Sequence, residues 1–126
     1  GLERLVADST VRCGILVVQT LHTTTAVLVN EHERRLLVDF QGLLERLAPE
    51  DATYLHDDPE RVRSLPPGER ENGYAHCRAL LLPPSVTLTI ADGRLRLGRW
   101  QRVFLLELDG PRERQVSVLA IGEGRP

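Results

Sequence analysis

Apolar stretches with the periodicity of strands are the dominant pattern of this 126-residue chain. Residues 14–21 form a nearly continuous apolar run, which is typical of a buried strand. Residues 85–90 alternate apolar and polar side chains, as a half-buried strand does. Shorter segments of strand character lie at 23–29, 94–97, 101–108 and 115–121. The pattern predicts a largely β structure in which the strand at 23–29 pairs with the strand at 14–21.

Helical periodicity is confined to a few segments. Apolar residues repeat at helical spacing across residues 33–47, and Asn30 can cap the start of that helix. Shorter helices are expected at 2–11 and at 74–82, where Pro83 and Pro84 would end the second. Two or three helices combined with mainly antiparallel strands indicate an α+β fold, and the chain length indicates a single domain over residues 1–126.

Two connections stand out between these elements. Asp92-Gly93 is a strong signal for a tight β-hairpin. Residues 49–73 form a long irregular segment rich in Pro, acidic residues and Arg. A connection of this length in a compact domain is usually functional or disordered, so this segment is a candidate source of site residues.

Composition narrows the chemistry that is open to the chain. The net charge of -2 gives no general attraction to nucleic acid or to anionic membranes, so an anion site must come from local clustering. Every basic side chain is Arg, which excludes Schiff-base chemistry by a lysine. Two cysteines without a CxxC motif, no apolar membrane-spanning run and no signal peptide fit a cytoplasmic protein with no membrane partner.

Histidines near strand and helix ends are the first candidates for chemistry. His22, Thr23 and Thr24 follow the 14–21 strand, and His76 comes four residues after Asn72. His56-Asp57 lies in the long irregular segment, so His22, His56 and His76 could assemble with Asp57 or Glu31. Three imidazoles suit a catalytic zinc, whereas carboxylates suit Mg²⁺ beside a diphosphate. The alternative is a set of histidines that are solvated or satisfied by hydrogen bonds.

The second group of candidates surrounds the only tryptophan. Trp100-Gln101 can pack in the core, or it can form one wall of a pocket with Trp100 stacked on a flat heterocycle. Arg112 and Arg114 are two residues apart in an extended stretch, so they share a face that suits a phosphate or carboxylate. The alternative for Arg112 is an ion pair with Asp109 that fixes the turn, and Glu31 can equally serve at the positive end of a helix.

These motifs occur in an order that resembles the YjbQ family, a group of small bacterial and archaeal proteins linked to a secondary thiamine-phosphate synthase activity. The resemblance runs from about Leu5 to Ile121 and rests on separated motifs: His22-Thr23-Thr24, Asn30-Glu31, Asn72 to His76, Trp100-Gln101 and Asp109 to Arg114. It implies homotrimers of sandwich- or prism-like domains. Compared with the family, an N-terminal strand is expected to be missing or very short, and Gly1 is not expected to be the native start.

The resemblance implies an enzyme that joins hydroxymethylpyrimidine diphosphate to a thiazole phosphate and releases diphosphate. His22 or His76 would transfer a proton or bind a divalent metal, zinc or magnesium. The residues expected to bind the phosphorylated substrate are Thr23, Thr24, Asn72, Trp100, Gln101, Arg112 and Arg114. No Asp-rich diphosphate motif or Gly-rich phosphate loop is present, which favours low efficiency or a side activity. The alternatives are a homotrimer that binds a metal or an anionic metabolite without turnover, and a metal-dependent hydrolase.

Overall fold

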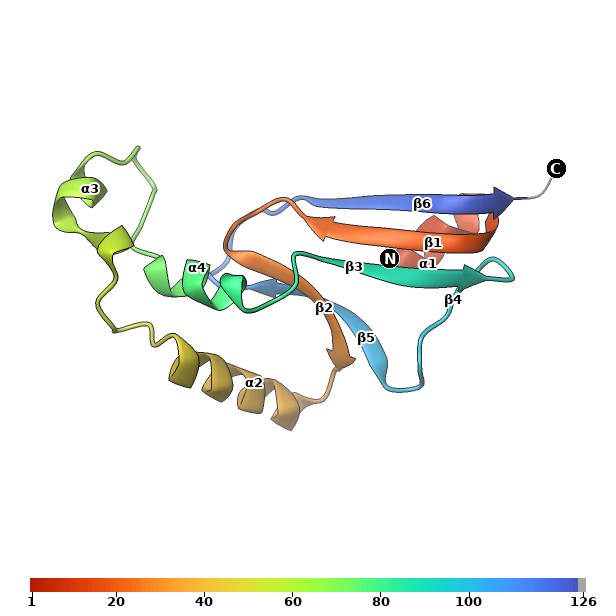
Figure 1. Ribbon diagram of the computed structural model, residues 1–126, viewed down its shortest axis with the longest axis horizontal. Helices are drawn as coiled ribbons and strands as arrows, with labels where there is room; N and C mark the ends of the chain where they lie inside the picture. Colours follow the sequence, from red (N-terminus) through yellow and green to blue (C-terminus); the bar gives the residue numbers. More distant parts are fainter. Residues whose placement is uncertain (125–126) are drawn as a thin grey trace.

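The computed structural model describes residues 1–124, which fold into two antiparallel sheets with helices at one end and on one face (Figure 1). The larger sheet has the order β4-β3-β1-β6, formed by Arg94–Leu95, Ser85–Ala91, Val11–Thr20 and Val116–Gly124. The second sheet is a two-stranded ribbon of β2 (Thr25–Glu31) and β5 (Gln101–Glu107). The α+β class with mostly antiparallel strands is therefore confirmed.

The predicted pairing of the first two strands is wrong. β1 pairs with β3 and β6, whereas β2 pairs with β5, from Thr25 opposite Glu107 to Glu31 opposite Gln101. The connection at residues 21–24 is not a two-residue hairpin turn, and the hydroxyls of Thr20 and Thr25 hydrogen-bond across its base. The chain thus leaves one sheet and enters the other, which places His22, Thr23 and Thr24 at the junction between them.

The tight hairpin at Asp92-Gly93 is confirmed. Both residues have positive φ angles, of 53° and 72°, as the two central positions of a type I′ turn require. This turn joins β3 to the short β4 strand. The chain then crosses to β5 through residues 96–100, so the hairpin positions the segment that carries Trp100.

The core lies between the larger sheet, helix α1 (Leu2–Asp8) and the β2–β5 ribbon. Its fully packed members are Val6, Leu16, Val18, Val27, Leu88 and Ile90. Alternate residues of β1 therefore face inward, and Ile15 points to the opposite side of the sheet, where 38% of it remains exposed. No helix or loop passes in front of β6, β1 and β3 in Figure 1.

Helices are present in the predicted segments 2–11, 33–47 and 74–82, as α1, α2 (Arg34–Leu47) and α4 (Gly73–Leu80), but α1 ends at Asp8 and Val11 already begins β1. The expected cap at Asn30 is wrong, because Asn30 lies in β2 and the Glu33 side chain caps α2. The expectation of two or three helices is too low, because the irregular segment also contains α3 (Pro59–Arg63) and a single 3₁₀ turn, η1 (Leu55–Asp57). The Asp58 side chain accepts a hydrogen bond from the Glu60 amide, and Pro59 occupies the first helical turn. These start signals of α3 are readable in the sequence.

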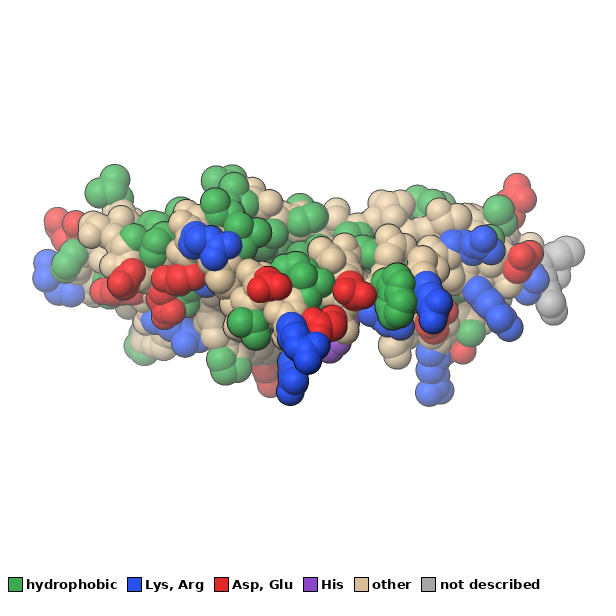
Figure 2. All heavy atoms as spheres, turned by 90° about the horizontal axis from the view of Figure 1, so that it is seen from below, with side chains coloured by type: hydrophobic (Ala, Val, Ile, Leu, Met, Phe, Trp, Pro, Cys, Tyr) green, Lys and Arg blue, Asp and Glu red, His purple; other side chains and the backbone are tan. Residues whose placement is uncertain are grey.

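Helix α2 contributes little to the core of its own chain. None of its residues is buried, although its sequence is amphipathic. In Figure 1, α2 lies below the sheets. Figure 2 views the molecule from below, and hydrophobic side chains lie among charged ones over the half that contains α2. Within the described residues, no helix is long and apolar enough to cross a membrane.

Candidate functional site

A polar cavity of about 370 Å³ opens where three connections meet. The turn between β1 and β2, the segment from η1 to α4, and the connection between β5 and β6 each contribute to its wall. We call it the His/Arg pocket. It brings together these predicted site residues: His22, Thr23, Thr24, His56, Asn72, His76, Arg112 and Arg114.

Asp109 is the anchor of this pocket. Its side chain is only 1% exposed, and a buried carboxylate requires compensating partners. Asn72 Nδ2 donates a hydrogen bond of 2.9 Å to Oδ2, Arg112 Nη2 lies 3.1 Å from the same oxygen, and Arg70 Nε lies 3.5 Å from Oδ1. The sequence analysis gave an ion pair with Asp109 as the alternative role of Arg112, and the structure contains this ion pair. Asp109 thereby fixes two guanidinium groups at the pocket wall.

Arg114 is held by a second carboxylate. Arg114 Nε and Nη2 donate to the two oxygens of Glu107 at 2.5 and 2.6 Å, and Nη2 also donates to Thr24 Oγ1 at 2.9 Å. The hydrogen bond from Arg114 lowers the pKa of Glu107, and the same contact raises the pKa of Arg114. This pair is therefore ionised at neutral pH, and it fixes Thr24 at the sheet junction.

The predicted placement of Arg112 and Arg114 on a strand is wrong, because residues 108–115 lie between β5 and β6 in an irregular connection. Gly110 adopts a φ of 72° in this connection, which bends the chain away from β5. Both guanidinium groups nevertheless line the same pocket. The carboxylates of Asp109 and Glu107, rather than strand alternation, orient them.

The pocket holds more positive than negative charge. Beyond the Arg114–Glu107 pair, the pocket has three guanidinium groups, from Arg61, Arg70 and Arg112. Two carboxylates, Asp109 and Glu69, pair with Arg70 and Arg112. Arg112 Nη2 is buried, and within residues 1–124 it has no hydrogen-bond partner. Its 3.1 Å approach to Asp109 is a charge contact without hydrogen-bond alignment. The Arg112 side chain as a whole is 27% exposed and lines the pocket, so its guanidinium group contributes positive charge to the pocket wall.

Two of the histidines form a pair. The rings of His56 and His76 meet edge to face with centroids 4.6 Å apart. Burial and then the neighbouring His56 lower the pKa of His76, so His76 is neutral near pH 7. The carbonyl of His56 accepts a hydrogen bond of 2.7 Å from Arg61 Nη1. His76 is suited to accept a proton or a hydrogen bond inside the pocket.

His22 is positioned differently. Its Nε2 accepts a hydrogen bond of 2.7 Å from the Gln115 amide, which ties the sheet junction to the start of β6. In the described part of the chain, no group of three or more His, Cys, Asp or Glu side chains is arranged to hold a metal ion. His22, His56 and His76 do not form such a group here, and the Nε2 lone pair of His22 has a partner in the Gln115 amide; zinc binding by these histidines stays a prediction.

Asp57 has a local structural task. Its Oδ1 accepts hydrogen bonds of 3.0 Å from the amides of Asn72 and Gly73, at the start of α4. A side chain at Gly73 would collide with Tyr54, because a Cβ there would lie 2.6 Å from the Tyr54 Cβ. Asp57 therefore holds α4, and with it His76, against the 3₁₀ turn that carries His56.

Three predicted site residues lie elsewhere. Glu31 and Gln101 are paired at the far end of the β2–β5 ribbon, beside Trp100. Seven ribbon residues separate this end from Thr24, a distance of about 20 Å at strand spacing. We call this region, formed by Glu31, Trp100 and Gln101, the Trp100 end. Trp100 is 62% exposed and is covered only in part by Arg99, whose guanidinium lies 4.8 Å from the ring centre.

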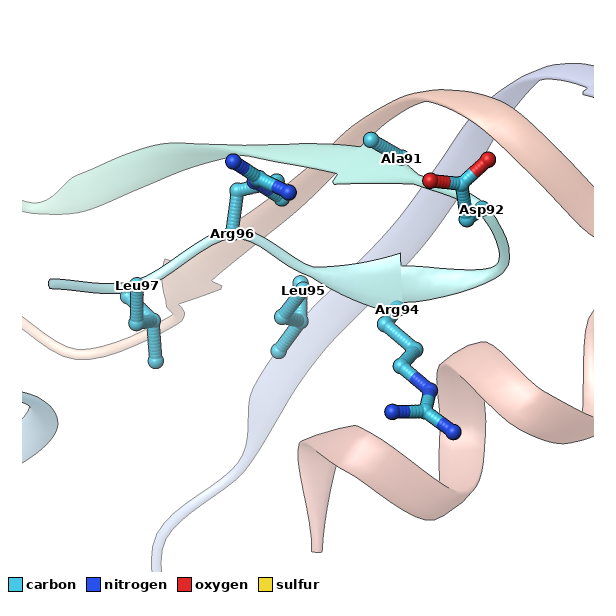
Figure 3. Close-up of a pocket in the computed structure, with 6 residues that line it drawn as sticks. All are labelled: Ala91, Asp92, Arg94, Leu95, Arg96 and Leu97. Atoms are coloured by element: carbon cyan, nitrogen blue, oxygen red, sulfur yellow. The ribbon is translucent and has the colours of Figure 1, made fainter. Parts of the chain in front are cut away.

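Another hollow, of about 500 Å³, lies along the β3–β4 hairpin (Figure 3). The side chains of Arg94 and Arg96 point away from each other there, and leucine side chains form much of the remaining wall. It contains no histidine and no paired acid and base. The His/Arg pocket is the candidate site because it gathers eight of the predicted site residues.

Sequence reasoning missed Arg61, Glu69 and Arg70, which also line the His/Arg pocket. All three belong to the irregular segment 49–73, in which several arginines and acidic residues alternate without a recognisable period. The length of that segment was the only available signal. Its folding across the pocket depends on contacts with Asp109 and Arg112, which are far away in the sequence.

The fold and this pocket define a class: a small α+β protein with a polar pocket lined by arginines and histidines at a sheet junction. The chain belongs to the family described as UPF0047 protein YjbQ-like, whose model matches residues 1–123. A UPF0047 protein of Archaeoglobus fulgidus is 42% identical over 121 residues, covering 92% of this chain and 88% of the relative. Another from Methanothermobacter thermautotrophicus is 40% identical, covering 92% and 74%.

Solved structures agree with this assignment. A YbjQ-like protein of unknown function from Sulfolobus solfataricus superposes with a TM-score of 0.84 at 31% identity, covering 97% of this chain and 82% of that one. A hypothetical protein from Aeropyrum pernix gives a TM-score of 0.80 at 34% identity, covering 95% and 82%. The family resemblance read from the sequence is confirmed.

Proposed function

We propose that the His/Arg pocket binds the diphosphate or phosphate group of a small metabolite. The observation that carries this proposal is that four arginines, Arg61, Arg70, Arg112 and Arg114, line one pocket. A guanidinium donates in a planar fork that matches phosphate oxygens. The surplus of positive charge over Asp109 and Glu69 favours an anion rather than a neutral ligand.

The reaction that best fits this pocket is the transfer expected from the family resemblance. The C–O bond of hydroxymethylpyrimidine diphosphate breaks, and the diphosphate leaves with the electron pair. The thiazole nitrogen of the second substrate donates its lone pair to the same carbon and forms the new N–C bond. No proton is lost from either partner, so the protein has to neutralise the leaving group, which Arg112, Arg70 and the Thr23 hydroxyl can do.

His76 has a supporting role in this reaction. Because its ring is neutral near pH 7, it can orient a protonated diphosphate oxygen or take up its proton. His22 is less available, since Nε2 is engaged by the Gln115 amide. No step is assigned to a protein-bound metal. A divalent cation can enter together with the diphosphate as part of the substrate.

Calorimetry with inorganic diphosphate tests the binding step. The Arg112→Gln variant should bind diphosphate at least about tenfold more weakly than the natural sequence, because one charge-assisted hydrogen bond contributes about 1.5–3 kcal/mol. Arg94→Gln is the matched control: it removes an exposed arginine that lies outside the pocket, and it should leave the affinity unchanged. Equal affinities of all three proteins would contradict the proposal.

Turnover is measured separately, with the two thiamine precursors in the presence and absence of Mg²⁺. Formation of thiamine phosphate that is reduced by His76→Gln supports the transferase. Binding of diphosphate without product formation leaves the anionic-metabolite-binding protein as the function of this pocket. The homotrimer implied by the family resemblance is a further part of the proposal, and sedimentation of the purified chain tests it.

A further inference from the structure

The His/Arg pocket supplies charge but no large aromatic wall. Its rings are the imidazoles of His22, His56 and His76, and none of the described lining residues is Trp, Tyr or Phe. The only tryptophan lies at the other end of the β2–β5 ribbon and is 62% exposed. A ligand whose ring carries a phosphate needs an aromatic surface for the ring and positive charge for the phosphate. This chain has both, but at opposite ends of the β2–β5 ribbon.

A single chain cannot bring these parts together. The β2–β5 ribbon is paired continuously from Thr25–Glu107 to Glu31–Gln101, which keeps the two ends about 20 Å apart. The loop carrying Trp100 is tied locally as well, because Gln101 Oε1 accepts a hydrogen bond of 2.8 Å from the Gly98 amide. Folding the Trp100 end back onto the pocket would break the ribbon.

We propose that a second copy of this chain completes the site: the Trp100 end of one protomer covers the His/Arg pocket of its neighbour. Trp100 then provides the stacking face for a heterocycle whose phosphate is held by Arg112 of the other protomer. Glu31, which is partly exposed at the Trp100 end, brings a carboxylate toward a pocket with surplus positive charge. The proposal rests on the proposed function only for the identity of the bound anion.

Two uncovered apolar surfaces supply the driving force for such an assembly. On the outer face of the larger sheet, Ile15, Leu119 and Ile121 are 38%, 55% and 52% exposed, and Ile15 is paired with Ile121 across the strands. On α2, Val38 and Leu47 are 64% and 57% exposed. A 14-residue helix without a buried residue is marginal in isolation, so a partner that covers it would stabilise it.

A second copy fits better than an unrelated partner. The exposed aromatic group and the pocket that lacks one belong to the same chain, so each protomer offers what its neighbour needs. Such head-to-tail contacts close into a ring when the rotation between protomers permits. The same contact then repeats around the assembly and completes every pocket.

Trp100 is an intrinsic reporter of this contact, because it is the only tryptophan. In the natural protein we expect an oligomer with a blue-shifted Trp100 emission that is protected from acrylamide. Leu119→Glu, and separately Val38→Glu, should dissociate the assembly, shift the emission to the red and restore quenching. A monomeric natural protein, or an oligomer in which Trp100 is quenched as freely as in the dissociated variants, overturns the proposal.

A mixing experiment tests whether the site itself is shared. Arg112→Gln retains Trp100 but has a damaged pocket, and Trp100→Phe retains the pocket without the reporter. After co-refolding of these two chains, inorganic diphosphate, at a concentration below the Kd of Arg112→Gln, should change the tryptophan emission, although neither variant responds alone at that concentration. A mixture of Arg112→Gln with Arg70→Gln is the control and should stay silent, because both pockets are damaged.

The two proposals fail in different ways. If calorimetry shows diphosphate binding to the natural protein but the mixed assembly gives no emission change, the shared site is wrong and the anion pocket stands. If diphosphate does not bind at all, the proposed function fails. The contact between protomers is then tested only by whether assembly buries Trp100.

Discussion

Asp109 shows at the scale of one residue how the pocket obtains its geometry. The carboxylate is buried among Arg70 and Asn72, which belong to the irregular segment 49–73, and Arg112, which lies in the same connection as Asp109. Removing a buried charge partner commonly costs several kcal/mol, since the remaining charge loses its compensation. Asp109 therefore positions the arginines, whereas the proposed contact with an anion falls to Arg112.

His76 is the residue whose titration should be visible in folding. Its pKa is lowered in the folded protein from an ordinary value of 6.5, so the unfolded chain binds the proton more tightly. The free energy of unfolding should fall as the pH drops below about 6.5 through the lowered pKa. Urea unfolding in phosphate-free buffer at a series of pH values measures this.

The His76→Gln variant isolates that contribution. Glutamine retains polarity but does not titrate, so the variant should lose less stability than the natural protein between pH 7 and about pH 5. Glu107, whose pKa is lowered by Arg114, should contribute only at more acidic pH, below its ordinary value of 4.5. Parallel stability curves for the two proteins would contradict the shift assigned to His76.

At the scale of elements, β1 and β6 approach unusually closely at a pair of facing glycines. Gly14 is opposite Gly122, and a Cβ at Gly14 would lie 2.0 Å from the Ile121 carbonyl oxygen. That neighbour is backbone, so relief requires a shift of the strand rather than of a flexible side chain. The close approach explains why glycine interrupts an otherwise apolar strand.

The same substitution should have opposite effects in two elements. Gly14→Ala should destabilise the protein by at least about 2 kcal/mol, as other strained backbone contacts do. Gly42→Ala in α2 meets only the end of the Arg46 side chain at 3.5 Å, and should stabilise the helix by roughly 0.5–1 kcal/mol. Thermal and urea unfolding compare the two, and equal effects would contradict the packing described for β1 and β6.

The elements themselves were predictable where the period was strong. The apolar run at 14–21 and the alternation at 85–90 became β1 and β3, because burial on one or both faces imposes the pattern. Pairing was not predictable in the same way: the strand at 23–29 follows β1 directly but joins β5. Neighbouring strands can form either a hairpin or a change of sheet, and local periodicity does not distinguish them.

At the scale of the whole molecule, stability should be distributed unevenly. β1 is paired on both sides and contributes Leu16 and Val18 to the core, whereas residues 66–71 are exposed and lie over the pocket. Amide exchange should therefore be slowest in β1 and fastest in 66–71. Diphosphate should slow exchange in 66–71, since Glu69 and Arg70 line the pocket. Equal exchange in both regions would contradict this distribution.

The sequence alone determined the α+β class, the hairpin at Asp92-Gly93 and the family, because these depend on local period, turn chemistry and ordered motifs. Only the tertiary structure decided which candidates meet. It placed Arg112, Arg114, His56 and His76 in one pocket with Arg61 and Arg70, and left Glu31, Trp100 and Gln101 at the other end of the ribbon. Proximity in a site depends on sheet pairing and on buried charge contacts between distant residues, and neither leaves a period in the sequence.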